Sequence, residues 1–149
     1  MDRGLFSLIH SQLPAKVSVH LQGWGEPLLH PDIFFHIRQL KSTGGIVSFT
    51  TNGTIMDKTV ADALVDSGLD GLTFSMAGNS DSTQDSLRGR GSFALLHSAI
   101  RTFNAAKNSR GGLLPRVAVS YLLTPKTGGE LANAVSWCCK NGVDAFARR

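Results

Sequence analysis

The stretch VSVHLQGWGEP, residues 17–27, decides the fold of this chain. Its first five residues are apolar at every second position, which is typical of a strand with one buried face. Two glycines, a carboxylate and a proline follow directly, where that strand should end. In parallel α/β proteins ligands bind at the carboxyl ends of strands, and glycine lets a ligand approach the backbone closely. The stretch therefore predicts either a tight turn or the floor of a binding site.

The rest of the chain repeats a strand–helix rhythm. Apolar, β-branched runs begin near Val17, Ile46, Leu72, Val117 and Val143. Helices are expected over about residues 5–13, after Asp32, after Asp57, from Ser92, and over the segment holding Leu131 and Cys138. Strands separated by helices need crossover connections, so the sheet should be parallel. The rhythm predicts an α/β fold in which residues 1–149 form a single domain, with residues 78–91 as a long loop.

The predicted strands also share a polar face. Small polar residues alternate with apolar ones, as His20 does in the first strand, Ser48 and Thr50 in the second, and Thr73 and Ser75 in the third. Alternation places each set on its own side of the sheet. A polar interior predicts a cavity that holds a ligand, whereas the alternative is a set of hydroxyls bonded to neighbouring backbone.

Composition excludes several classes of protein. The net charge is +4, but the basic residues are scattered and are not interleaved with aromatic residues, so no nucleic-acid partner is expected. No apolar run is long enough to span a bilayer, and a cytoplasmic location is expected. The adjacent Cys138 and Cys139 lack the spacing of a zinc site or a disulfide framework, so no metal ligands are expected in this chain.

Further polar motifs follow the second and third strands. The run TTNGT at residues 50–54 combines hydroxyls with an Asn-Gly turn, and Ser75 places a hydroxyl at the end of the third strand. The run RGRG at residues 88–91 offers cations that could meet a carboxylate or a phosphate. These motifs predict that Glu26, Thr50, Ser75 and Arg88 surround one rim.

Taken together, the motifs resemble the radical SAM superfamily. The matching runs are GEPLLHPD at 25–32, TTNGT at 50–54, SGLD at 67–70 ahead of LTFS at 72–75, and RGRGSF at 88–93. The chain is most similar to the branch of SPASM-domain maturases and the molybdenum-cofactor precursor enzyme. The resemblance implies a partial (β/α) TIM-type barrel of about five parallel strands, open at its edges. It also implies S-adenosylmethionine, a [4Fe–4S] cluster and reductive cleavage to a 5′-deoxyadenosyl radical.

The resemblance assigns cofactor-binding roles to six residues. Gly25 and Glu26 would hold the methionyl amino group, and Thr50 would line the site with Thr51 beside it. Ser75 would meet the ribose, and Arg88 would pair with the methionyl carboxylate. The substrate implied is a peptide or a small metabolite.

The chain departs from the family pattern in two places. Trp24 stands where the family has a glycine, and its indole is expected to pack in the core. The Cys-x3-Cys-x2-Cys run that binds the cluster is missing, so the chain is expected to be an inactive central portion of a radical SAM core without its N-terminal part. Two alternatives stay open: a flavodoxin-like doubly wound domain, and a non-catalytic relative that binds S-adenosylmethionine.

Overall fold

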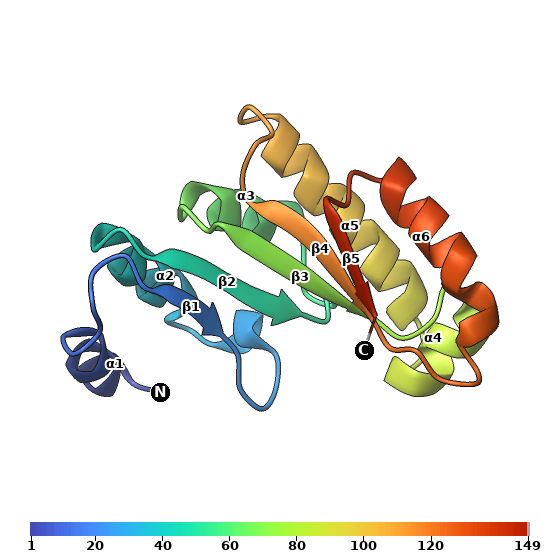
Figure 1. The fold of residues 1–149 in the computed structure, drawn as a ribbon, viewed down its shortest axis with the longest axis horizontal. Helices are drawn as coiled ribbons and strands as arrows, with labels where there is room; N and C mark the ends of the chain where they lie inside the picture. Colours follow the sequence, from blue (N-terminus) through green and yellow to red (C-terminus); the bar gives the residue numbers. More distant parts are fainter. Residues whose placement is uncertain (149) are drawn as a thin grey trace.

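Five parallel strands form one sheet in the order of the chain, β1-β2-β3-β4-β5 (Figure 1). A computed structural model describes residues 1–148 of the 149-residue chain. The strands are β1 (Ser18–Leu21), β2 (Ile46–Thr51), β3 (Gly71–Met76), β4 (Arg116–Tyr121) and β5 (Ala145–Arg148). Each pairs in parallel with the next. The predicted five-stranded parallel sheet is therefore confirmed.

Helices connect the strands and cover one side of the sheet. They are α1 (Arg3–His10), α2 (Ile33–Ser42), α3 (Lys58–Asp66), α4 (Asp81–Arg88), α5 (Ser92–Asn108) and α6 (Leu131–Lys140), with short 3₁₀ turns η1 (Pro27–Leu29) and η2 (Gly128–Glu130). In Figure 1, α2, α3, α5 and α6 lie on the same side of the strands. A doubly wound domain has helices on both faces and a reversal in strand order, so the flavodoxin-like alternative is wrong. The sheet is an open, partial barrel.

The two faces of the sheet differ as the alternation predicts. Side chains that point toward the helices, including Phe49, Phe74 and Val119, are completely buried. The opposite face, called the open face below, carries His20, Thr50 and Thr73 in neighbouring positions of the strands. Burial of apolar side chains on one face contributes most of the stability of such a layer. The open face leaves its polar side chains to ligands or water.

Residues 78–91 are not the continuous loop that the sequence predicts, because they contain α4. The side chain of Ser80 caps this helix by accepting a hydrogen bond from the backbone N–H of Thr83 at 3.3 Å. The helix is mostly polar, and Leu87 is its one aliphatic side chain. Hydrophobic periodicity therefore could not reveal it.

Other local signals agree with the structure. Asp57 caps α3 by accepting from the N–H of Val60 at 2.7 Å, and Gly68 follows that helix with a φ of 80°. The leading helix is shorter than expected and ends at His10. Within residues 1–148, no helix combines the length and apolarity that crossing a membrane requires.

Candidate functional site

A polar cavity of about 360 Å³ lies at the carboxyl ends of β1, β2 and β3. Its lining combines glycine backbone, hydroxyls, amides and one guanidinium, from Gln22, Gly23, Gly25, Glu26, Thr50, Thr51, Asn52, Ser75 and Arg88. All six residues singled out from the sequence are among them. Parallel strands end at the same edge of a sheet, which brings together side chains that are far apart in the sequence.

Glu26 ties the loop after β1 to the end of β2. Its Oε1 accepts from the hydroxyl of Thr51 at 2.7 Å and from the N–H of Leu28 at 3.2 Å. Its Oε2 accepts from the N–H of Asn52 at 2.7 Å. An ionised carboxylate has about four lone-pair sites. Three are occupied by these bonds, so one site on Oε2 is left for a ligand.

The two neighbouring threonines face opposite sides of the sheet. Thr51 is buried, donates to Glu26, and accepts from the N–H of Gly53 at 3.0 Å. Thr50 lies on the open face, where its hydroxyl is 3.1 Å from Nε2 of His20. Thr51 therefore positions the loops, whereas Thr50 presents its hydroxyl to the cavity.

The glycines of the first loop expose backbone to the cavity. Gly25 has a φ of 104°, a conformation that side-chain-bearing residues rarely adopt. A Cβ atom at Gly23 or Gly25 would meet nothing within 4 Å. Trp24, between them, has a relative exposure of 107%, so the expectation that its indole packs in the core is wrong. The strand has already ended at Leu21, and the loop carries the indole away from the helices.

Arg88 reaches the cavity from the last position of α4. The turn after it is fixed by Asp85, whose carboxylate accepts from the N–H of Phe93 at 2.8 Å and of Gly91 at 2.6 Å. These backbone hydrogen bonds hold the pKa of Asp85 below its ordinary value. A second hollow of about 280 Å³ shares Asn52, Ser75 and Arg88 with the first.

The site also contains Gln22 and Asn52, which line the cavity and were not among the site residues expected from the sequence. His20 lies beside the cavity on the open face, where alternation places it. Nε2 of His20 is 2.9 Å from Oε1 of Gln22, and Nδ1 of His20 is 2.9 Å from the hydroxyl oxygen of Ser48. The available signal was alternation, which continues from His20 to Gln22 beyond the strand.

The described residues do not supply ligands for an iron–sulfur cluster. No group of three or more His, Cys, Asp or Glu side chains within residues 1–148 could hold a metal ion. Cys138 is buried on α6 and Cys139 is exposed. Burial raises the pKa of the Cys138 thiol to about 12, which opposes the thiolate form that binds iron. A cluster therefore does not fit this donor set.

Known proteins similar to this chain agree with this arrangement. A family model described as the radical SAM superfamily matches residues 10–138. A GTP 3′,8-cyclase of Chlorobaculum tepidum is 52% identical over 54 residues, which cover 35% of this chain and 16% of that protein. The tungsten-containing aldehyde ferredoxin oxidoreductase cofactor-modifying protein of Pyrococcus furiosus is 24% identical over 149 residues, covering 98% of this chain and 42% of that protein.

A solved structure with a similar fold is SuiB of Streptococcus suis bound to S-adenosylmethionine. It has a TM-score of 0.73 and 19% sequence identity, and the match covers 88% of this chain and 29% of SuiB. The chain thus spans less than half the length of each of these proteins. The family model covers most of the chain. The chain belongs to the radical SAM superfamily.

Proposed function

We propose that this chain forms the part of a radical SAM enzyme that binds the methionyl and ribosyl groups of S-adenosylmethionine. The observation that carries the proposal is the polar cavity, because Gly25, Glu26, Thr50, Ser75 and Arg88 all line it. The family uses S-adenosylmethionine together with a [4Fe–4S] cluster, whose electron cleaves the cofactor to a 5′-deoxyadenosyl radical.

The charges of the cavity suit a zwitterionic amino acid. Arg88 is a cation that matches a carboxylate. The free lone-pair site on Oε2 of Glu26 accepts from an ammonium group, and the exposed backbone around Gly25 adds carbonyl acceptors. A cavity that offers both a cation and hydrogen-bond acceptors can fix the orientation of such a ligand.

The hydroxyls of the cavity suit a ribose. Ser75 is the residue of β3 that lines the cavity, and Thr50 is the open-face residue of β2 that does so. Hydroxyl side chains both donate and accept hydrogen bonds, as ribose hydroxyls do. Thr51 acts differently, because its bond to Glu26 holds the loop that carries Gly25.

The cluster would need thiolates from outside the described residues, since Cys138 and Cys139 do not fit. The substrate proposed is a small organic molecule or a peptide. SuiB has been solved bound to its precursor peptide SuiA, and the Chlorobaculum relative is named for GTP. The open face of the sheet is the surface of this chain that would meet either class.

The proposal is tested by titrating the ¹⁵N-labelled chain with S-adenosylmethionine. We expect the amide resonances of Gly25, Asn52 and Ser75 to shift, because these residues line the cavity. Replacement of Arg88 by alanine should weaken binding about tenfold, as expected for loss of a charge-assisted hydrogen bond.

A matched control is Arg90→Ala, which removes an exposed arginine two residues away that does not line the cavity. This variant should bind within about twofold of the unmodified chain. The proposal fails if S-adenosylmethionine shifts no resonance of the folded chain. It also fails if the Arg88 and Arg90 variants bind equally well.

A further inference from the structure

Trp24 is unusual because its large apolar side chain has no cover. Its relative exposure is 107%, higher than that of any other large hydrophobic side chain in residues 1–148. The second tryptophan, Trp137, is half-buried and its ring lies 3.8 Å from that of His97, centroid to centroid. Covering the faces of an indole is favourable, because it removes a large apolar area from water. Trp24 therefore presents two uncovered faces beside the candidate site.

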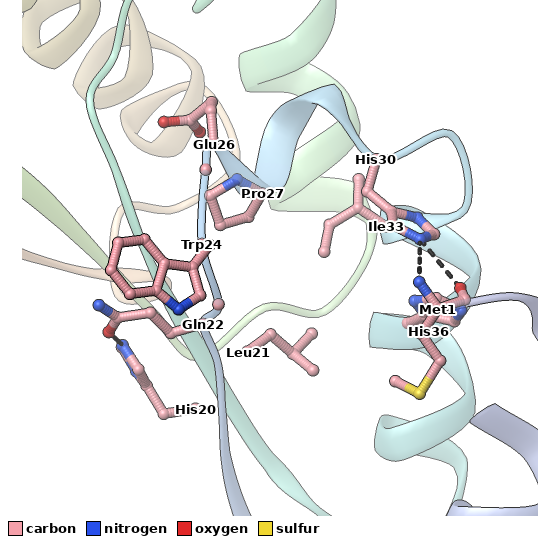
Figure 2. Close-up of a pocket in the computed structure, with 12 residues that line it drawn as sticks. Met1, His20, Leu21, Gln22, Trp24, Glu26, Pro27, His30, Ile33 and His36 are labelled. Atoms are coloured by element: carbon pink, nitrogen blue, oxygen red, sulfur yellow. Dashed lines mark hydrogen bonds between the residues drawn. The ribbon is translucent and has the colours of Figure 1, made fainter. Parts of the chain in front are cut away.

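The direction of Trp24 places it over the open face. Figure 2 shows its indole on the same side of the loop as the side chains of Gln22 and His20, and away from Leu21 and Pro27. Its position continues the series His20, Gln22, Trp24 beyond the end of β1. These three residues line one side of a hollow of about 350 Å³ that shares Gln22, Gly23, Gly25 and Glu26 with the polar cavity. The rest of its lining comes from Met1, Leu21, Pro27, His30, Ile33 and His36.

The open-face side chains near Trp24 offer hydrogen bonds, and the carboxylate that lines the same hollow is that of Glu26. His20 connects Ser48, Thr50 and Gln22 at distances of 2.9 to 3.1 Å. By alternation and register, the described open-face positions of the five strands contain no carboxylate; they are Ser18, His20, Ile46, Ser48, Thr50, Gly71, Thr73, Ser75, Arg116, Ala118, Ser120, Ala145 and Ala147. A planar ring with polar edges suits these hydrogen-bonding groups, because their donors and acceptors can meet the ring at its edge.

We propose that Trp24 is a stacking platform for a planar nitrogen heterocycle, held by indole contact on its face and by hydrogen bonds from the Gln22 and His20 side at its edge. The location rests on the proposed function, because the heterocycle would belong to a ligand of that site. Two sources share this chemistry: the adenine of S-adenosylmethionine, and a heterocyclic substrate.

The two tryptophans give the proposal a direct optical test. In the Trp137→Phe variant, all tryptophan fluorescence comes from Trp24, and a stacked heterocycle should quench it. The variant is titrated with S-adenosylmethionine, with methionine as the probe that lacks a ring, and with GTP and neopterin as heterocycles unrelated to the cofactor. Methionine should leave the emission unchanged. Quenching by S-adenosylmethionine alone identifies adenine as the source, and quenching by GTP or neopterin in saturating S-adenosylmethionine identifies a substrate ring.

Measurements on two further variants complete the test. Trp24→Gly should weaken binding of the quenching heterocycle about tenfold or more, as loss of base–aromatic stacking does elsewhere. Trp24→Phe should retain part of that affinity, because its ring also stacks. As the control, Trp24→Phe leaves Trp137 as the one tryptophan, and its emission should not respond to any probe.

The proposal is overturned if Trp24 emission responds to no heterocycle, or if Trp24→Gly binds the quenching heterocycle as tightly as the unmodified chain. That failure differs from failure of the proposed function. If S-adenosylmethionine shifts the amides of Asn52 and Ser75 while Trp24 stays silent to every ring, the stacking role is wrong and the cofactor site stands. If GTP quenches Trp24 while S-adenosylmethionine shifts nothing, the cofactor site is wrong and the stacking role stands.

Discussion

The hydroxyl of Thr51 donates to the carboxylate of Glu26 at 2.7 Å, and this bond fastens the loop after β1 to the end of β2. The two residues are 25 positions apart in the sequence. The same carboxylate also accepts from backbone N–H groups on both loops. The position of the glycine backbone in the cavity therefore depends on one side chain.

Removal of that side chain should destabilise the whole sheet edge. Glu26→Ala leaves the hydroxyl of Thr51 and the N–H groups of Leu28 and Asn52 without their acceptor, and we expect a loss of about 2 to 3 kcal/mol in unfolding free energy. Thr51→Val removes one of these bonds and should cost about 1 kcal/mol. Urea denaturation measures both, and an alanine variant as stable as the unmodified chain would contradict the assignment.

Glu130 joins the loop after β4 to the start of α4. Its carboxylate accepts from the N–H of Asn79 and from the hydroxyls of Ser80 and Thr83, each at 2.6 Å. Burial raises the pKa of Glu130, but these hydrogen bonds outweigh burial, and the pKa lies below its ordinary value. Glu130→Gln should therefore cost about 2 kcal/mol at neutral pH.

The lowered pKa of Glu130 also gives a pH test with a defined sign. A depressed carboxyl pKa contributes stability above the unfolded-state pKa, near 4.5, and that stability is lost as the pH falls through the folded-state pKa. Unfolding free energies measured from pH 6 to pH 3 should fall less steeply in Glu130→Gln than in the unmodified chain. Parallel curves would show that the carboxylate contributes nothing to α4.

His97 predicts a second effect of pH on stability, at higher pH than the effect of Glu130. Burial first, and then the charge of Arg101, lowers the pKa of His97 to about 4, whereas the charge of Asp81 opposes the shift. The unfolded chain takes up this proton near pH 6.5 and the folded chain does not, so stability falls between about pH 6.5 and pH 4, by about 2 kcal/mol. His97→Phe should flatten unfolding curves in this range, and curves as steep as those of the unmodified chain would contradict this assignment.

Gly78 predicts a steric effect on the segment that carries Arg88. A Cβ atom at this position would lie 2.6 Å from Cβ of Thr83 and 2.8 Å from the backbone N of Gln84. Gly78→Ala therefore forces α4 to move, and we expect a loss of about 1 to 3 kcal/mol in unfolding free energy. Gly129→Ala is the control, because its Cβ meets nothing within 4 Å. Equal unfolding free energies of the two variants would contradict the predicted steric clash at position 78.

Most of the fold could be predicted from alternation, whereas the residues of the site rim were expected from motifs at the strand ends and from the resemblance to the radical SAM superfamily. Apolar residues such as Phe49 and Phe74 fix which face of each strand is buried, and parallel pairing then brings the strand ends together. The residues of α4 carry no such period, and their helix depends on the Ser80 cap and on Glu130, which comes 50 residues later. Short-range sequence patterns carry no information about a contact between residues that are 50 positions apart.

Trp24 shows a different limit of sequence reasoning. An indole is suited both to a core and to a ligand surface, so its residue type does not decide between them. The outcome depended on where the glycine loop turned after Leu21, which is a property of the backbone. In the same way, Thr50 and Thr51 have the same chemistry, and only their alternation along β2 places the hydroxyl of Thr50 on the open face and that of Thr51 against Glu26.

The one-sided cover of the sheet has a consequence for how this protein can change over generations. Phe74 serves folding while its neighbours Thr73 and Ser75 serve the open face, and the same division recurs along β2 and β4. Replacements on the open face remove little buried apolar area, so they leave the fold nearly as stable as before. Ligand preference can therefore drift, position by position, while the scaffold is inherited intact.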